Sequence, residues 1–177
     1  AIVDPYVKVD TSYWVYQQGI ANGYFVKKAD GTVLTGRGWA ELNAFPDFAS
    51  PKVRAWWGGL LKQQLDEGVA GYLTDMNEPT LVSSGSTPAS TFPLDAVHDT
   101  EIGPRTHAEI HNVYGMLETM ATREGMIRAR PDRLPFIITR STYGGGQRFA
   151  GQWSGDIYGT WDRLRITAPM RTDMGLS

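Results

Sequence analysis

Two segments of the chain end an apolar run with a carboxylate, and these residue types can perform acid–base chemistry. Gly71–Pro79 passes from an apolar run into Asp75 and Glu78, and Gln152–Asp156 ends in a second acidic turn. Arg140 closes a third apolar run between them. Buried strands present polar side chains at their ends in this way. The pattern therefore suggests a reaction that needs a paired acid and base, with a cation beside it.

Composition limits the partners. The chain has 177 residues, is 41% hydrophobic and 20% charged, and carries a net charge of −2, which is typical of a globular domain able to bury a core. No cluster of Lys and Arg indicates a nucleic acid or an anionic membrane surface, and no apolar run reaches the roughly 20 residues of a membrane-spanning helix. We therefore expect a neutral partner, with no nucleic acid and no membrane.

Compartment and oligomeric state are less constrained. The chain has no cysteine, which excludes a thiolate nucleophile and a thiolate metal site and is compatible with the cytoplasm. No signal peptide opens the chain, but its first residue is Ala1 and not Met, so secretion stays open beside a cytoplasmic location. The oligomeric state is left unknown.

Short apolar runs alternate with amphipathic helical patterns, which favours βα units and a parallel sheet. A helix is expected after Ser50, and a second one after a capping box formed by Thr106 and Glu109. A third helix is expected from about Thr160. The expected strands are 1–3, 6–9, 69–74, 136–139 and 149–154.

Two segments depart from this alternation. Residues 11–44 are rich in glycine and aromatic residues and contain the turn pairs Asn22-Gly23 and Asp30-Gly31, so we predict a β-rich insertion there. Residues 80–105 are rich in Ser, Thr, Pro and Gly without periodicity, which is typical of a functional loop.

The alternation fits either a (β/α)8 barrel or a doubly wound sheet. Gly144–Gly146 precede another strand and not a helix, so we interpret them as a tight turn and not as a phosphate site. His107 and His111 have the i, i+4 spacing of metal ligands, but no third ligand is evident. We expect no metal and no cofactor.

Several motifs together resemble glycoside hydrolase family 31, and more specifically its α-glucosidases. They occur in the family's order and extend over essentially the whole chain. Two further stretches, 92–95 and 111–115, are most similar to bacterial members. The motifs are Phe45–Phe48, Asp75–Pro79, Thr139–Ser141, Gln147-Arg148 and Trp153–Asp156. The resemblance implies a (β/α)8 barrel with flanking β-domains.

The resemblance also implies catalytic roles. It makes Asp75 the nucleophile and Asp156 the general acid/base of a retaining glycosidase, in which one carboxylate attacks the anomeric carbon and the other carboxyl group protonates the leaving oxygen. The residues alone leave Asp75 and Glu78 as competing candidates. By resemblance Glu78 and Asn77 are supporting. Asp156 would need burial and a neighbouring charge to hold its proton near neutral pH.

Substrate contacts follow from the same resemblance. Arg140 and Met76 are expected to bind the sugar, and Trp153 and Trp39 are expected to form walls of its pocket. Trp56, Trp57 and Trp161 are expected in the core.

Two departures from the family pattern concern the pocket wall. Leu73 replaces a tryptophan, and Trp39-Ala40-Glu41 replaces a Trp-Pro-Gly run. Neither position carries a reacting group, so subsite preference is affected more than chemistry. The expected activity is hydrolysis of terminal α-linked glucose from an α-glucoside or maltooligosaccharide. An α-xylosidase, an α-transglucosidase or a non-catalytic carbohydrate-binding homologue stay as alternatives.

The length fits only part of a barrel. A complete (β/α)8 barrel needs about 250 residues, so residues 1–177 are interpreted as a single incomplete catalytic domain that covers about strands 3 to 6. The resemblance places Met174–Ser177 where the family continues into its next strand. We therefore expect a fragment of a longer protein that is inactive alone and that aggregates or stays partly unfolded.

Overall fold

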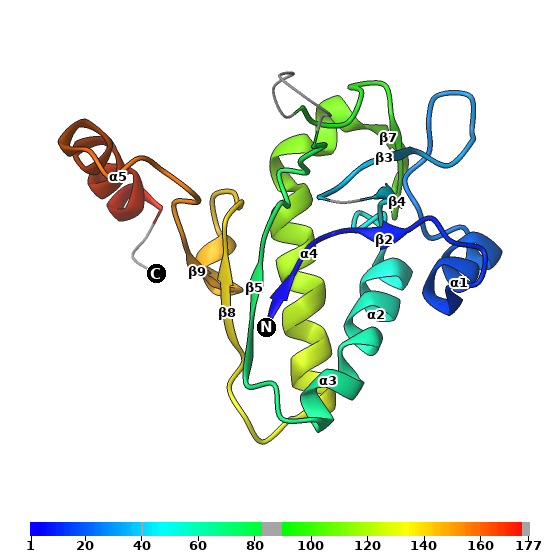
Figure 1. Ribbon diagram of the computed structural model, residues 1–177, viewed down its shortest axis with the longest axis horizontal. Coiled ribbons are helices and arrows are strands. Elements are labelled where there is room, and N and C mark those ends of the chain that lie inside the picture. The colour runs from blue at the N-terminus through cyan, green and yellow to red at the C-terminus, as the bar shows by residue number, and fades with distance from the viewer. Residues whose placement is uncertain (40, 83–89, 175–177) are drawn as a thin grey trace.

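A four-stranded parallel sheet organises the structure, a computed structural model that describes residues 1–39, 41–82 and 90–174. The strand order is β1-β5-β8-β9, and every pairing is parallel (Figure 1). The sheet does not close on itself, so β1 and β9 are its edges. This confirms the expected α/β fold and parallel sheet of a partial barrel. The strands are β1 (Ile2–Val3), β5 (Gly71–Thr74), β8 (Phe136–Thr139) and β9 (Gly151–Gln152).

Side chains alternate in the two central strands. Tyr72 and Thr74 of β5 are buried, as are Ile137 and Thr139 of β8, whereas their neighbours are less covered. Phe136, the first residue of β8, is 65% exposed. One face of the sheet is therefore packed, and the other is open along these strands.

Helices cover the packed face (Figure 1). Here α2 (Pro51–Leu60) and α4 (His107–Ala129) lie in close contact, because a Cβ atom on Gly125 would lie 2.4 Å from Cα of Gly58. Only glycine at both positions lets the two backbones approach so closely. The predicted capping box of Thr106 and Glu109 is confirmed at the start of α4. The helix predicted after Ser50 is divided into α2 and α3 (Lys62–Asp66).

The segment 11–44 contains a helix that the sequence analysis missed, α1 (Trp14–Asn22), beside the expected strands. Gly19 lies within α1, where a Cβ atom would overlap the ring of Phe25. Glycine disfavours helices in isolation, and here packing against an aromatic ring outweighs that preference. Strands on either side of α1 form an antiparallel sheet with the order β2-β4-β3. Its strands are β2 (Val7–Lys8), β3 (Thr35–Arg37) and β4 (Leu42–Ala44).

Residues 80–105, expected as a functional loop, include most of a hairpin formed by β6 (Val97–Thr100) and β7 (Gly103–Thr106). Residues 83–89 of that loop, together with Ala40 and residues 175–177, lie outside the described residues. Near the glycine turn, Gly146–Arg148 form the short 3-10 helix η1. In the described part of the chain no helix is both long and apolar enough to cross a bilayer.

Aromatic rings form much of the core. Phe48 packs edge to face against Trp57 and Tyr114, and Phe92 packs against Phe45 and Tyr114. Trp57 is buried and Trp56 packs against this core, as expected. The expectation for Trp161 is wrong, because its side chain is 86% exposed on α5 (Trp161–Asp173). Figure 1 shows that α5 extends away from the sheet, so no described element covers it.

The open sheet predicts that the 177-residue chain, purified alone, associates with itself or fails to melt cooperatively. Its edge strands β1 and β9 leave backbone groups unpaired, and apolar side chains such as Ile2, Phe136 and Trp161 are exposed. Unpaired edges and exposed apolar surface both favour association. Size-exclusion chromatography with light scattering, together with thermal melting, measures this. A monomer with a sharp transition would contradict the prediction.

Candidate active site

The sheet register brings four residues to one edge. Val3 pairs with Thr74, Thr74 pairs with Thr139, and Thr139 pairs with Gln152. Because the strands are parallel, the residue that follows each of these positions lies beside its neighbours at the same edge of the sheet. Those residues are Asp4, Asp75, Arg140 and Trp153.

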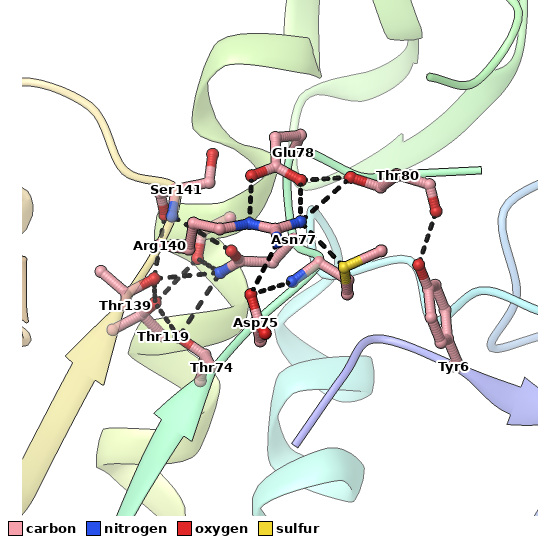
Figure 2. Close-up of polar contacts among 12 residues, drawn as sticks. Tyr6, Thr74, Asp75, Asn77, Glu78, Thr80, Thr119, Thr139, Arg140 and Ser141 are labelled. Carbon is pink, nitrogen blue, oxygen red and sulfur yellow. Dashed lines mark hydrogen bonds and ion pairs between the residues drawn. The ribbon is translucent and has the colours of Figure 1, made fainter. Parts of the chain in front are cut away.

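Arg140 is the centre of this edge (Figure 2). Its Nε and Nη2 atoms donate to the two carboxylate oxygens of Glu78, each at 2.8 Å. Its Nη1 atom lies 3.1 Å from Oδ1 of Asp75. The Thr80 hydroxyl also donates to Glu78 and accepts from Nη2 of Arg140 at 3.3 Å. One guanidinium therefore holds both carboxylates that the sequence could not rank.

The two carboxylates have different environments. Burial alone would raise the pKa of Glu78, but hydrogen bonds from Arg140 and Thr80 outweigh it and keep that pKa below its ordinary value. For Arg140, burial alone would lower the pKa, but the negative charges of Glu78 and Asp75 outweigh it and hold the pKa above its usual value. Both oxygens of Glu78 are occupied by Arg140 and Thr80. Glu78 is therefore an ionised partner of the cation.

Asp75 keeps one oxygen available. Its Oδ1 atom accepts the backbone N–H of Met76 at 2.9 Å and faces Arg140. Among the described residues, no hydrogen bond reaches its Oδ2 atom. The side chain is 17% exposed. Asp75 is thus held through Oδ1, and its Oδ2 atom stays free of hydrogen bonds from the described residues.

Met76 makes the turn that separates the two acids. Its φ angle is +54°, in the left-handed region that few residues other than glycine adopt, and its side chain is buried. Its sulfur accepts from Nη2 of Arg140 at 2.9 Å. The turn lets Glu78 approach Arg140 from the side opposite Asp75 (Figure 2). The structure thus places Met76 against the cation.

Asn77 lies below this layer and is fully buried. Its Nδ2 atom donates to Oγ1 of Thr139 at 3.1 Å and to the carbonyl oxygen of Gly115 at 3.3 Å, and its Oδ1 atom accepts the backbone N–H of Ser141 at 3.2 Å. These partners belong to β8, to α4 and to the segment after β8. Asn77 therefore joins the strand ends to the helix behind them.

The loop after β9 carries Asp156 and packs against Arg140. Gly155 has a φ of +73°, and a Cβ atom there would lie 2.9 Å from Cδ of Arg140. Glycine is required for both reasons. Asp156 itself is exposed, which differs from the burial that its expected role requires. The loop contacts Arg140 through Gly155, and no described segment covers the carboxyl group.

The two tryptophans differ in position. Trp153 is half-buried at the strand end, and its backbone N–H donates to the carbonyl oxygen of Thr139 at 2.8 Å. Trp39 is 66% exposed in the segment between β3 and β4, and no described contact joins it to the carboxylates. The structure therefore brings Trp153, but not Trp39, to the site.

His107 and His111 belong to a hydrogen-bonded row and not to a set of ligands. Asp47 binds Nδ1 of His98 at 2.7 Å, His98 binds His107 at 2.9 Å, and His107 binds His111 at 3.2 Å. Burial, followed by the neighbouring imidazoles, lowers the pKa of His107 to about 3, so it stays neutral. The described residues contain no group of three or more His, Asp or Glu side chains suited to a metal ion.

Two carboxyl groups near the site were missed by the sequence analysis. Asp4 was interpreted only as the end of a strand, although it follows an apolar run as Asp75 does. Glu118 is fully buried on α4, and burial raises its pKa well above the ordinary value although the neighbouring Asn77 amide opposes that shift. An acidic residue inside a helix gives no sequence signal of burial, whereas the apolar run before Asp4 was such a signal.

Comparisons with known proteins agree with this architecture. Residues 1–177 match the model of the glycosyl hydrolases family 31 TIM-barrel domain. The chain is 41% identical to alpha-glucosidase 2 of Bacillus thermoamyloliquefaciens and 38% identical to the human neutral alpha-glucosidase AB, each over 99% of its length. It covers 22% and 18% of those proteins, and so spans about a fifth of the curated relatives it matches.

Solved structures give the same result. The chain superposes on the glucosidase II alpha subunit with a TM-score of 0.85 at 30% identity, covering 99% of this chain and 19% of that one. It superposes on a family 31 alpha-glucosidase from Bacteroides thetaiotaomicron with a TM-score of 0.76 at 42% identity, covering 99% and 27%.

Replacing Asn77 tests the support below the strand ends. The change Asn77→Ala removes hydrogen bonds from several buried groups, and unsatisfied buried groups cost about 1–3 kcal/mol each. We expect the free energy of unfolding of a folded protein that contains this chain to fall by at least about 2 kcal/mol. Chemical denaturation measures it, with Asn22→Ala at the exposed end of α1 as the matched control. Equal stabilities of the two variants would contradict the assigned role.

Proposed function

The chain belongs to glycosyl hydrolase family 31, and on that premise we propose that it carries the catalytic pair of a retaining α-glucosidase within a longer protein. Asp75 is the nucleophile and Asp156 the general acid/base. The substrate is an α-glucoside or maltooligosaccharide, cleaved at its terminal α-linked glucose. The glucosidase names of the relatives support this substrate class.

The observation that carries the proposal is the unequal use of the two acids beside Arg140. Glu78 has both oxygens engaged, whereas Asp75 keeps Oδ2 available and is held through Oδ1. A nucleophile needs a free lone pair and a fixed orientation. Asp75 meets both conditions, whereas Glu78 is fixed in orientation but has no free oxygen.

The reaction proceeds in two displacements. In the first, Oδ2 of Asp75 forms a bond to the anomeric carbon, the glycosidic C–O bond breaks, and Asp156 gives its proton to the departing oxygen. In the second, Asp156 takes a proton from water, the water oxygen attacks the anomeric carbon, and the bond to Asp75 breaks. Each step inverts the anomeric centre, so glucose is released with its α configuration.

Arg140 can also bind the sugar. A guanidinium has five N–H groups, and Nε, Nη2 and one hydrogen of Nη1 face the carboxylates, Met76 and Thr80. The other hydrogen of Nη1 is left for a sugar hydroxyl. Its direction is fixed by the bidentate contact with Glu78, which fits a positioning role in the substrate complex. Trp153, the residue that follows β9, supplies an apolar ring against which the C–H face of the sugar can pack.

Asp156 reaches the substrate from its loop. Gly155 anchors that loop on Arg140 while the carboxyl group stays exposed. A bound sugar that covers the strand end would remove water from Asp156, and desolvation favours the protonated form that a general acid needs. The bound substrate itself therefore excludes part of the water around the Asp156 carboxyl group.

Mechanism-based labelling tests the proposal. The longer protein that carries this chain is treated with an activated fluoroglucosyl fluoride, which forms the glycosyl-enzyme quickly and hydrolyses slowly. We expect a covalent adduct on the peptide that contains Asp75, identified by tandem mass spectrometry. Glu78→Gln is the comparison variant and should be labelled on Asp75 as well, only more slowly than the wild type, because Glu78 orients Arg140 and does not react. An adduct on Glu78, or none in an enzyme that hydrolyses aryl α-glucosides, would overturn the assignment, and a protein that binds maltose without turnover would be a binding homologue.

A further inference from the structure

Asp4 is the one acid at the strand edge that neither the sequence motifs nor the proposed reaction uses. It follows β1 directly, and the backbone N–H of Asp75 donates to the carbonyl oxygen of Val3 at 3.1 Å. The Asp4 backbone is fixed in turn, because its carbonyl oxygen accepts the N–H of Tyr6 at 2.8 Å and Pro5 is buried. The two acids therefore stand side by side on adjacent parallel strands.

The Asp4 carboxyl group is not engaged by the structure. Its Oδ1 atom is buried and has no hydrogen-bond partner. Leaving a buried carboxylate oxygen unpaired costs free energy, so a fold tolerates it where the charge has a use. The backbone of Asp4 is thus held in place, while Oδ1 of its carboxyl group makes no hydrogen bond within the fold.

The titratable groups around Asp4 come from several neighbouring elements. Asp75 follows β5, Arg140 follows β8, and Glu118 lies on α4. Burial raises the pKa of Glu118 well above its ordinary value, so this acid is uncharged near neutral pH. Tyr6, before β2, is also uncharged, because burial and the charge of Asp4 raise its pKa.

Asp4 therefore faces one anion and one cation. Glu78 is already neutralised by its two hydrogen bonds with Arg140. Burial and then the Asp75 charge raise the pKa of Asp4 to about 6, and Arg140 opposes them. Asp4 consequently changes charge within the pH range in which such an enzyme works, next to the proposed nucleophile.

We propose that Asp4 is a positioning residue for Asp75, whose ionised carboxylate opposes the pull of Arg140 on the nucleophile and keeps its free oxygen reactive. Arg140 stabilises the charge on Asp75, and a fully stabilised carboxylate attacks poorly. A second negative charge on the adjacent strand weakens that stabilisation without contact with the sugar. When Asp4 takes a proton, this effect is lost. The inference rests on the proposed role of Asp75.

The pH dependence of kcat/KM in the longer protein tests the inference. In the wild type the acid limb should fall near pH 6, because Asp4 becomes protonated there. Asp4→Asn removes the titration, so its acid limb should move to lower pH by about one unit or more. Its plateau should fall by up to about tenfold, since one unit of basicity corresponds to a factor of ten. Asp132→Asn, an exposed acid remote from the sheet edge, is the matched control and should leave the profile unchanged.

Asp4→Glu keeps a carboxyl group at the strand edge but moves it by one methylene, so its acid limb should lie between those of the wild type and Asp4→Asn. If Asp4→Asn fails to fold, Asp4→Glu is the readout, because a purely structural role would leave its acid limb at the wild-type pH. An unchanged acid limb in a folded Asp4→Asn protein would overturn the inference. Labelling of Asp75 in the same preparations separates the two proposals. If Asp75 is labelled but the acid limb of Asp4→Asn does not move, only the role of Asp4 is contradicted. If Asp75 is not labelled, the proposed function is contradicted.

Discussion

The ion pair between Arg140 and Glu78 is the contact on which the arrangement of the strand ends depends. Two hydrogen bonds of 2.8 Å fix the guanidinium plane, and the third nitrogen then faces Asp75 at 3.1 Å. A guanidinium that donates to both oxygens of a carboxylate is fixed in orientation as well as paired in charge. Without Glu78, Arg140 could turn its guanidinium onto Asp75 and occupy the oxygen that chemistry requires.

The scaffold places these groups through register and close packing. Parallel pairing aligns the residues after β1, β5, β8 and β9, and the glycine contact between α2 and α4 brings the helices close behind the sheet. Asn77 then joins the strand ends to α4. Small changes in any of these layers would move Arg140 relative to Asp75, and catalysis is sensitive to such displacements.

Much of the sheet and site could be predicted from sequence, because apolar runs that end in acids or arginine have a direct physical meaning. β8 and the capping box of α4 follow from local patterns. The choice between Asp75 and Glu78 did not follow from the residues, since it depends on how many oxygens of each acid the arginine occupies across two strands. Only the family resemblance ranked them, and the geometry gives a reason for that ranking.

Other features depend on distant contacts and were therefore missed. α1 contains Gly19 because a ring from outside the helix occupies the space of a side chain. Trp161 has the helical position of a core residue, but α5 leaves the sheet and exposes it. Asp4 and Glu118 are ordinary acids in the sequence, and only the fold reveals that Asp4 has a buried, unpaired oxygen and that Glu118 is fully buried.

A double-mutant cycle on Glu78 and Arg140 measures whether the two side chains act as one unit. Glu78→Gln, Arg140→Lys and the double variant of the longer protein are compared by kcat/KM on an aryl α-glucoside. If Glu78 acts only by holding Arg140, the double variant should lose little more than Arg140→Lys alone, with a coupling energy of about 1–3 kcal/mol. Losses that simply add would show that Glu78 works independently of Arg140, and would contradict the account.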